Sequence, residues 1–174
     1  VSASEGEAWV RKASVGALLG IMPWNYPYYQ VARFAAPNLM AGNVVMVKHA
    51  SNVPQCALAF ESVMRDAGAP CGAYTNLFIS KDQISKVIDD ARIRAVALTG
   101  SEAAGAVVAA RAGKNLKKST MELGGSDAFI VLDDADLEKT IPWAVWGRMF
   151  NGGQTCCAAQ RFTVQEAIAV KFLA

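Results

Sequence analysis

The sequence predicts an α/β fold built on a parallel sheet. The run Val44-Val45-Met46-Val47 is rich in β-branched residues without a break, which is typical of a strand covered on both faces. Strand-like segments then alternate with segments whose apolar residues recur at helical spacing, and the connections are short. No internal repeat, low-complexity tract or Ser/Gly linker points to another organisation.

The first complete helix is predicted directly after this strand. Ser51 and Asn52 can cap it, Pro54 suits its first turn, and Gly68 ends it. Between these signals, apolar residues share one helix face: Phe60, Val63, Met64 and Ala67. A short strand is expected over residues 74–79, and a second helix from about Asp82 to residue 91.

The alternation continues with a strand over residues 93–99 and a helix over residues 103–112. The segment from Met121 to Gly125 is expected to interrupt it, before a strand over residues 128–132 and a helix over residues 137–149. Two adjacent glycines tolerate the backbone angles of a crossover, so we place a domain boundary near Gly124-Gly125. A plain turn would explain the glycines equally well.

The length and composition of the chain exclude several classes of protein. The 174 residues suggest one domain, or one and a fraction, and a content of 53% hydrophobic and 18% charged residues excludes intrinsic disorder. The net charge of +2 argues against a nucleic-acid or membrane-surface partner. No apolar run reaches the roughly 18 residues of a membrane span, and the first residues do not resemble a signal peptide.

Cysteine usage indicates a reduced compartment. The four cysteines, at positions 56, 71, 156 and 157, form no C-x-x-C pair, and the sequence has a single histidine, His49. This pattern disfavours both a zinc site and a disulfide framework, so no metal is expected. We therefore expect a soluble protein in the cytoplasm.

Four segments carry the chemistry: Pro23-Trp24-Asn25-Tyr26-Pro27, Val47-Lys48-His49-Ala50-Ser51, Met121-Glu122-Leu123-Gly124-Gly125 and Phe150-Asn151-Gly152-Gly153-Gln154-Thr155-Cys156. Each segment alone is weak evidence of function, because such residues commonly occur in turns, on surfaces or in the packed core. In this order they resemble the aldehyde dehydrogenase superfamily, whose motifs are P-W-N-[FY]-P, E-L-G-G and G-Q-x-C. The resemblance runs from about Val15 to the end of the chain.

The resemblance implies a domain organisation. Residues 1–14 would end an N-terminal, oligomerisation-strand region, residues 15–123 would form an incomplete dinucleotide-binding domain of Rossmann type, and residues 124–174 would begin the catalytic domain. The chain then corresponds to the central part of a longer enzyme that forms a homodimer or tetramer. We expect the 174 residues alone to be inactive, because hydride transfer needs the nicotinamide held against the substrate.

Aldehyde oxidation needs a thiolate, an oxyanion stabiliser, a hydride acceptor and a base. Cys156 matches the nucleophile of the family motif, Asn25 its oxyanion-stabilising amide and Glu122 its general base. Cys157 must point elsewhere and is expected to be a packing or redox-bystander residue. The alternative for Glu122, a surface salt bridge, is disfavoured by its apolar and glycine-rich neighbours.

The implied hydride acceptor is a nicotinamide cofactor, although no G-x-G-x-x-G follows the first strand. Instead, Gly100 and Gly105 give G-x-x-x-x-G at a helix start, which suits a pyrophosphate. Ser51 replaces the Glu of many NAD-selective relatives, while Lys48, and His49 when protonated, add positive charge, so we expect NADP with NAD tolerated. The resemblance assigns these cofactor residues: Ile21, Met22, Pro23, Trp24, Lys48, His49, Ala50, Ser51, Gly100, Ser101, Gly105, Leu123 and Gly124.

Arg33 is a candidate for binding the substrate. It lies eight residues after Asn25, two turns along the expected helix, where a guanidinium would pair with a substrate carboxylate. Succinate-semialdehyde dehydrogenases carry Arg at this offset, so succinate semialdehyde is the expected substrate, with Arg148 a second candidate. A structural ion pair of Arg33, another small aldehyde, or a non-catalytic nucleotide- or protein-binding module are the alternatives.

Overall fold

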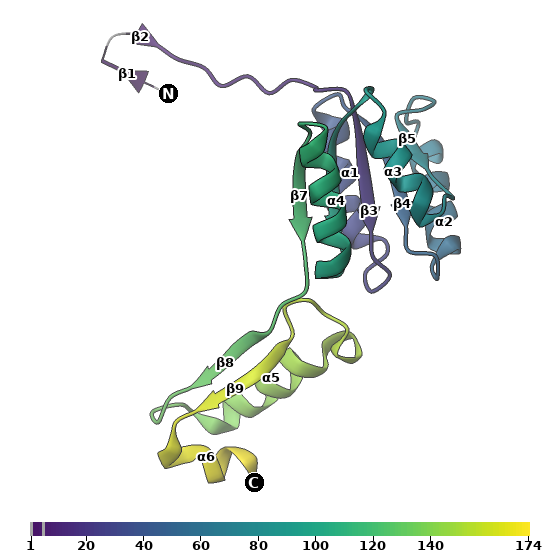
Figure 1. The fold of residues 1–174 in the computed structure, drawn as a ribbon. Coiled ribbons are helices and arrows are strands. Elements are labelled where there is room, and N and C mark those ends of the chain that lie inside the picture. The colour runs from purple at the N-terminus through teal and green to yellow at the C-terminus, as the bar shows by residue number, and fades with distance from the viewer. Residues whose placement is uncertain (1, 5) are drawn as a thin grey trace. The chain divides into compact units, whose positions relative to one another are not determined.

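The computed structural model describes residues 2–4 and 6–174 and is drawn as a ribbon in Figure 1. The chain divides into two compact units, one ending at Glu122 and the other beginning at Leu123. No helix among the described residues is both long and apolar enough to cross a lipid bilayer.

A five-stranded, fully parallel sheet forms the centre of the N-terminal unit, with strand order β5-β4-β3-β6-β7. The strands are β3 (Ala17–Met22), β4 (Val44–His49), β5 (Tyr74–Asn76), β6 (Ile93–Thr99) and β7 (Lys118–Glu122). Ahead of the sheet, β1 (Ser2–Ala3) and β2 (Gly6–Glu7) form a short antiparallel pair. The predicted α/β class with a parallel sheet is confirmed.

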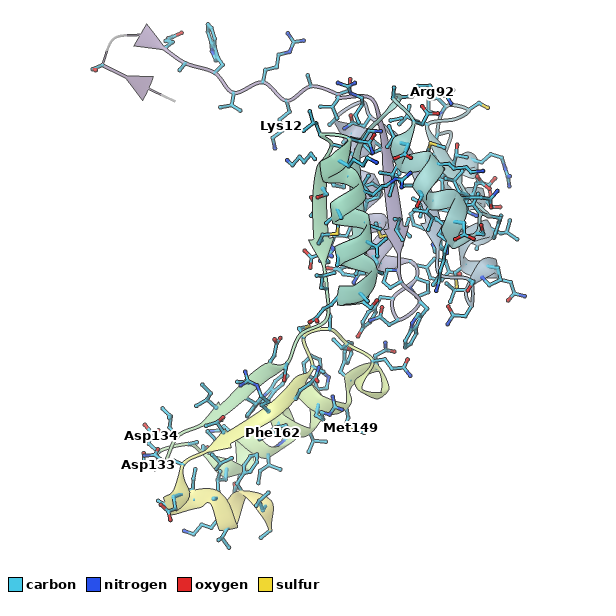
Figure 2. The ribbon with its side chains drawn as sticks, viewed as in Figure 1. Lys12, Arg92, Asp133, Asp134, Met149 and Phe162 are labelled. Carbon is cyan, nitrogen blue, oxygen red and sulfur yellow. The ribbon has the colours of Figure 1, made fainter. Side chains whose placement is uncertain are left out.

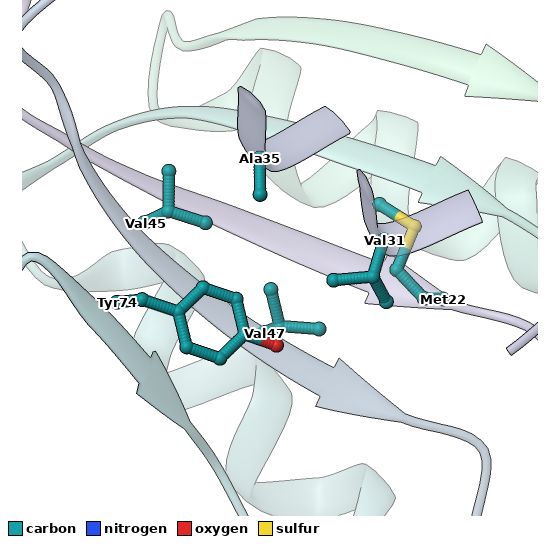
Figure 3. Close-up of a cluster of buried hydrophobic side chains, with 6 residues drawn as sticks. All are labelled: Met22, Val31, Ala35, Val45, Val47 and Tyr74. Carbon is teal, nitrogen blue, oxygen red and sulfur yellow. The ribbon is translucent and has the colours of Figure 1, made fainter. Parts of the chain in front are cut away.

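Helices connect the strands in sequence. They are α1 (Tyr29–Met40), α2 (Pro54–Asp66), α3 (Lys81–Asp89) and α4 (Glu102–Lys114). Side chains of α1 and α2 pack with those of β3, β4 and β5 in one buried cluster, whose six buried members are shown in Figure 3: Met22, Val31, Ala35, Val45, Val47 and Tyr74. Right-handed crossovers place α3 and α4, which contact each other, on the opposite face.

Gly20 sits where α1 comes closest to the sheet. A Cβ atom at this position would lie 2.5 Å from Cε1 of Phe34, so only glycine leaves room for the ring. The position of α1 on the sheet, and with it the side chains that α1 presents, therefore depends on the missing side chain.

The strand order creates a switch point between β3 and β6. These strands are hydrogen-bonded neighbours, but the chain leaves β3 through α1 on one face and leaves β6 through α4 on the other. In open α/β sheets ligands bind in the crevice at the carboxyl ends of such strands. The loops at those ends begin with Pro23 after β3 and Gly100 after β6.

Three expectations about elements of this unit are wrong. The segment at Met121 does not interrupt the alternation, because residues 118–122 form the edge strand β7. The strand predicted over residues 74–79 ends at Asn76. Ser51 does not cap α2, since the N-cap residue is Val53 and it has no side-chain capping hydrogen bond.

The C-terminal unit is a single βαβ motif extended by one helix. Strands β8 (Asp127–Val131) and β9 (Ala159–Val164) are parallel, joined through α5 (Leu137–Met149) and the 3-10 turn η1 (Phe150–Gly153). Helix α6 (Glu166–Leu173) follows β9. Met149 and Phe162, labelled in Figure 2, come from α5 and β9 and line a largely apolar cavity of about 520 Å³.

Candidate functional site

The loop between β3 and α1 carries Asn25. Its residues 23–28 run from the carboxyl end of β3 to the first turn of α1, and Asn25 is half-buried. The loop is held by His49, the last residue of β4, whose Nε2 lies 3.3 Å from the carbonyl oxygen of Pro27. Nδ1 of the same ring lies 3.3 Å from Oδ1 of Asn76 on β5. His49 thus ties the Asn25 loop to the centre of the sheet.

Burial decides the charge state of His49. The side chain is only 5% exposed, and desolvation lowers its pKa below the usual 6.5, although the contacts with Asn76 and Pro27 oppose this and the charge of Lys48 adds to it. His49 is therefore neutral at pH 7. The attraction for a cofactor phosphate that a protonated His49 would add stays a prediction, and the neutral form of this buried ring does not supply it.

Glu122 and Arg33 form an ion pair within the N-terminal unit. Glu122 is the last residue of β7, and its backbone carbonyl accepts a hydrogen bond of 3.0 Å from the N–H of Gly100. Nη2 of Arg33, on the second turn of α1, lies 3.8 Å from Oε2 of Glu122. The two candidate residues, 89 positions apart in the sequence, thus lie side by side.

An open groove of about 540 Å³ contains this ion pair. Helices α1 and α2 pack over β3, β4 and β5, and the groove lies beside α1 over β6 and β7. The sheet side of the groove consists of small residues on β6 and alternate residues of β7: Ala95, Ala97, Thr99, Lys118, Thr120 and Glu122. Gln30, Arg33 and Phe34 form the helix side.

The start of α4 fits a phosphate group. Ser101 is its N-cap residue, and Oγ accepts a hydrogen bond of 3.3 Å from the N–H of Ala104. The hydroxyl hydrogen stays available, and free N–H groups of the first turn add to the positive end of the helix dipole. Gly105 is buried on the next turn. This is the β6 side of the switch-point crevice.

A second concave surface lies where β4 and β5 end. It has a volume of about 210 Å³ and is lined by Lys48, His49, Ala50, Ser51, Pro54, Asn76, Leu77, Phe78 and Ile79. Lys48 donates a hydrogen bond of 3.0 Å to the carbonyl oxygen of His49, and burial lowers its pKa, with Lys81 as a further cause. Ser51 is exposed here and makes no hydrogen bond with another described residue, so its hydroxyl is accessible to a ligand.

The residues at the end of β3 and just after it differ in their exposure. Met22 is 3% exposed and belongs to the buried cluster. Ile21 and Pro23 are half-buried, and Trp24 is 47% exposed. Trp24 is thus an exposed aromatic side chain just after β3.

Cys156 lies in a tight turn of the C-terminal unit. The N–H of Ala158 donates to the carbonyl oxygen of Thr155 over 3.1 Å, which places Cys156 and Cys157 at the two central positions of a β-turn. Both thiols are free and exposed. Upstream, Asn151, Gly152 and Gly153 all have left-handed φ angles of 53° to 77°, which let η1 turn the chain from α5 toward Cys156.

Two further segments support this turn. Gly125 lies against it, since a Cβ at this glycine would be 3.4 Å from the carbonyl oxygen of Cys156. The side chain of Gln160 donates to the Gly125 carbonyl over 2.9 Å, and Arg161 donates to that of Ser126 over the same distance. Leu123 and Gly124 precede these anchored residues and are half-buried and exposed, respectively.

Arg148 lies beside the glycine turn. On the last turn of α5, its guanidinium approaches Gly153, where an added Cβ would be 3.6 Å from Nη1 and 3.3 Å from the Arg148 carbonyl oxygen. Arg148 also lines the apolar cavity between α5, β9 and α6. Its contacts are those of a residue that supports the loop leading to Cys156.

The sequence analysis did not identify Gln30, a polar residue that lines the groove. Gln30, on the first turn of α1, is 5% exposed, and its Oε1 has no hydrogen-bond partner in the described part of the chain. Its position three residues before Arg33 was the only available signal. Within residues 2–4 and 6–174, no three His, Cys, Asp or Glu side chains cluster in a way that could hold a metal ion.

Together, these features define an open, parallel α/β unit joined to a βαβ unit that displays an exposed cysteine. The model of the aldehyde dehydrogenase family matches residues 1–174, so the chain belongs to that family.

Similar proteins extend this result. The NADP(+) succinate-semialdehyde dehydrogenase of Deinococcus radiodurans is 54% identical over 97% of this chain and 35% of its own length. Among solved structures, Gox0499 is 61% identical with a TM-score of 0.96, and the Streptococcus pyogenes succinic semialdehyde dehydrogenase bound to NADP+ is 48% identical with a TM-score of 0.94. Both matches cover 99% of this chain and 38% of the other. The chain thus spans little more than a third of the relatives' length.

Proposed function

We propose that the protein containing this chain oxidises succinate semialdehyde to succinate, with NADP as the preferred hydride acceptor and NAD as a possible one. The observation that carries the substrate class is the guanidinium of Arg33, which lies in an open groove 3.8 Å from the Glu122 carboxylate. A cation this close to the proposed base suits an aldehyde whose far end is a carboxylate. The relatives named for this reaction support the proposal.

The chemistry assigned to Cys156 begins with its thiolate. The sulfur attacks the aldehyde carbon, a C–S bond forms, and the carbonyl electrons move to oxygen to give a thiohemiacetal. In this proposal the side-chain amide of Asn25 and the N–H of Cys156 stabilise that oxyanion. When bound, NADP would supply the hydride acceptor, and loss of the hydride from this carbon would leave a thioester on Cys156.

Glu122 is assigned to the second half of the reaction. It takes a proton from a water molecule whose oxygen attacks the thioester carbon, the C–S bond breaks, and Cys156 leaves as a thiolate with the acid as product.

The cofactor residues are proposed on the fit of two surfaces. The N-terminus of α4, with Ser101 and Gly105, would hold the pyrophosphate, and Trp24 would lie along the nicotinamide half. Lys48 and Ser51 share the surface at the end of β4, where no carboxylate lines the wall, so a 2′-phosphate meets a cation and a hydroxyl. This composition supports NADP over NAD.

The remaining organisation is also proposed. Residues 15–123 would serve as part of the cofactor domain, residues 124–174 as the start of the catalytic domain, and residues 1–14 as the end of an N-terminal region. We propose a cytoplasmic homodimer or tetramer. The exposed aromatic residues Trp143 and Trp146 of α5, which pack edge to face, support burial of this helix in a larger assembly.

The test is kcat/KM of the complete protein for a panel of semialdehydes and unsubstituted aldehydes, with NADP and with NAD. The proposal predicts the highest value for succinate semialdehyde with NADP. Arg33→Leu should raise KM for acidic aldehydes far more than for neutral ones, while Arg65→Leu, an exposed arginine of α2, should change neither. Equal effects of Arg33→Leu on both classes would remove Arg33 from the substrate site.

A further inference from the structure

We propose that Arg33 restrains Glu122 until a substrate carboxylate takes its place, so that an acidic aldehyde releases the base that completes its own oxidation. This inference rests on the proposed function and concerns the regulation of the same site. It makes Arg33 a gate for deacylation in addition to an anchor for the substrate.

The ion pair between Arg33 and Glu122 is weak enough for a substrate to displace it. At 3.8 Å the Nη2 to Oε2 distance is too long for a hydrogen bond, and the two side chains are 44% and 53% exposed. Exposed pairs of this kind are weak. A substrate carboxylate can instead accept two parallel hydrogen bonds from the guanidinium, which is the stronger arrangement. Competition for Arg33 therefore favours the substrate over Glu122.

The backbone of Glu122 is fixed while its side chain can move. Its carbonyl accepts from the N–H of Gly100, and the residue pairs with Thr99 at the end of the sheet. Release from Arg33 thus changes the direction of the carboxylate without moving β7. Lys118 lines the same groove four residues earlier on β7, about 13 Å along the strand, so it does not replace Arg33 as a partner of Glu122.

Arg33 has a second acceptor within reach. Gln30 lies three residues earlier on α1, which makes the two side chains neighbours on the helix surface. Its Oε1 is buried without a hydrogen-bond partner among the described residues, which is unfavourable for a polar atom. A guanidinium that turns away from Glu122 toward a substrate carboxylate can also donate to this oxygen. The groove therefore offers Arg33 two positions, one with Glu122 and one with Gln30.

The side chain of Glu122 must be free of Arg33 in one step, the hydrolysis of the thioester. The attacking water gives its proton to Oε of Glu122 while its oxygen bonds to the thioester carbon and the Cys156 thiolate departs. The gate requires that a carboxylate held by Arg33 be turned away from that water. An aldehyde without a carboxylate should then be converted to the acyl-enzyme but hydrolysed from it slowly, because nothing displaces Arg33.

The experiment replaces succinate semialdehyde with two smaller molecules. Propanal carries the aldehyde group, and formate carries the carboxylate. With the complete protein and NADP, the decay of the propanoyl-enzyme is followed by rapid quench, with and without formate, at constant ionic strength set with sodium chloride. We expect formate to accelerate decay by roughly two- to fivefold, the range that corresponds to release of an exposed ion pair. Butanal is the control, because its fourth carbon occupies the position that formate would take.

Arg33→Leu separates gating from positioning. In this variant the propanoyl-enzyme should decay at the faster rate without formate, and formate should have no effect; Arg65→Leu should behave as the wild type. Slower decay in Arg33→Leu, or no acceleration by formate in the wild type, would overturn the gate even if succinate semialdehyde is oxidised well. A wild type that does not oxidise succinate semialdehyde at all would overturn the proposed function, and the gate with it.

Discussion

His49 Nε2 lies 3.3 Å from the carbonyl oxygen of Pro27, so the last residue of β4 holds the loop that carries Asn25. The imidazole is buried, and burial lowers the pKa of His49 below 6.5, although the contact with Pro27 acts in the opposite direction. Protonation would place a positive charge in the protein interior, beside Met22 on the neighbouring strand β3, where water solvates it poorly.

A pH-dependent stability follows from this burial. Below pH 6.5 the unfolded chain binds a proton on His49 that the folded protein does not, so the contribution of His49 to stability is complete above pH 6.5 and declines as the pH falls toward the lower folded-state pKa. Thermal denaturation of the complete protein between pH 7.5 and 5.5 should show a larger loss of Tm in the wild type than in His49→Gln. Equal losses would show that His49 is not the buried titrating group.

Gly20→Ala should destabilise the N-terminal unit by about 1–3 kcal/mol, because the new methyl group would lie 2.5 Å from the Phe34 ring. Urea denaturation provides the measurement. Gly113→Ala on α4, where an added Cβ meets nothing within 4 Å, is the matched control and should not destabilise. Combining Gly20→Ala with Phe34→Leu should recover part of the loss, and a loss that is unchanged in the double variant would place the strain elsewhere.

Ser51→Glu should reverse the cofactor preference. A carboxylate at this exposed position would repel a 2′-phosphate and accept hydrogen bonds from unmodified ribose hydroxyls. We expect kcat/KM with NADP to fall on the order of tenfold to a hundredfold, and that with NAD to hold or rise. Gln55→Glu, an exposed position in the first turn of α2, adds the same charge outside the surface and should leave the ratio near that of the wild type.

The sheet and its helices were largely predictable because strand and helix periodicity alternate clearly from residue 44 to residue 112. Strand β7 was missed because Lys118, Ser119 and Thr120 are polar and exposed on a sheet edge, which leaves no hydrophobic pattern. The burial of His49 was readable in principle. Val45, Val47 and His49 are alternate residues of one strand, and all three are buried.

The candidate residues could be selected from motifs, but their contacts could not. The pairing of Arg33 with Glu122 depends on how α1 lies over a sheet whose order differs from the order of its strands in the sequence. The unpartnered Oε1 of Gln30 likewise appears only once the helix is packed. The choice between a substrate-binding Arg33 and a structural ion pair was therefore open in the sequence, and the observed pair joins Arg33 to the proposed base itself.

The central claim is that Cys156, Asn25 and Glu122 act on a single carbon atom. Its most direct test is mass spectrometry of the Glu122→Gln variant of the complete protein after reaction with succinate semialdehyde and NADP. We predict a burst of NADPH equal to the number of active sites and a succinyl group trapped on Cys156, with none on Cys157. Asn25→Ala in the same background should slow the burst on the order of a hundredfold. Steady turnover without a trapped acyl group, or acylation at Cys157, would contradict the claim.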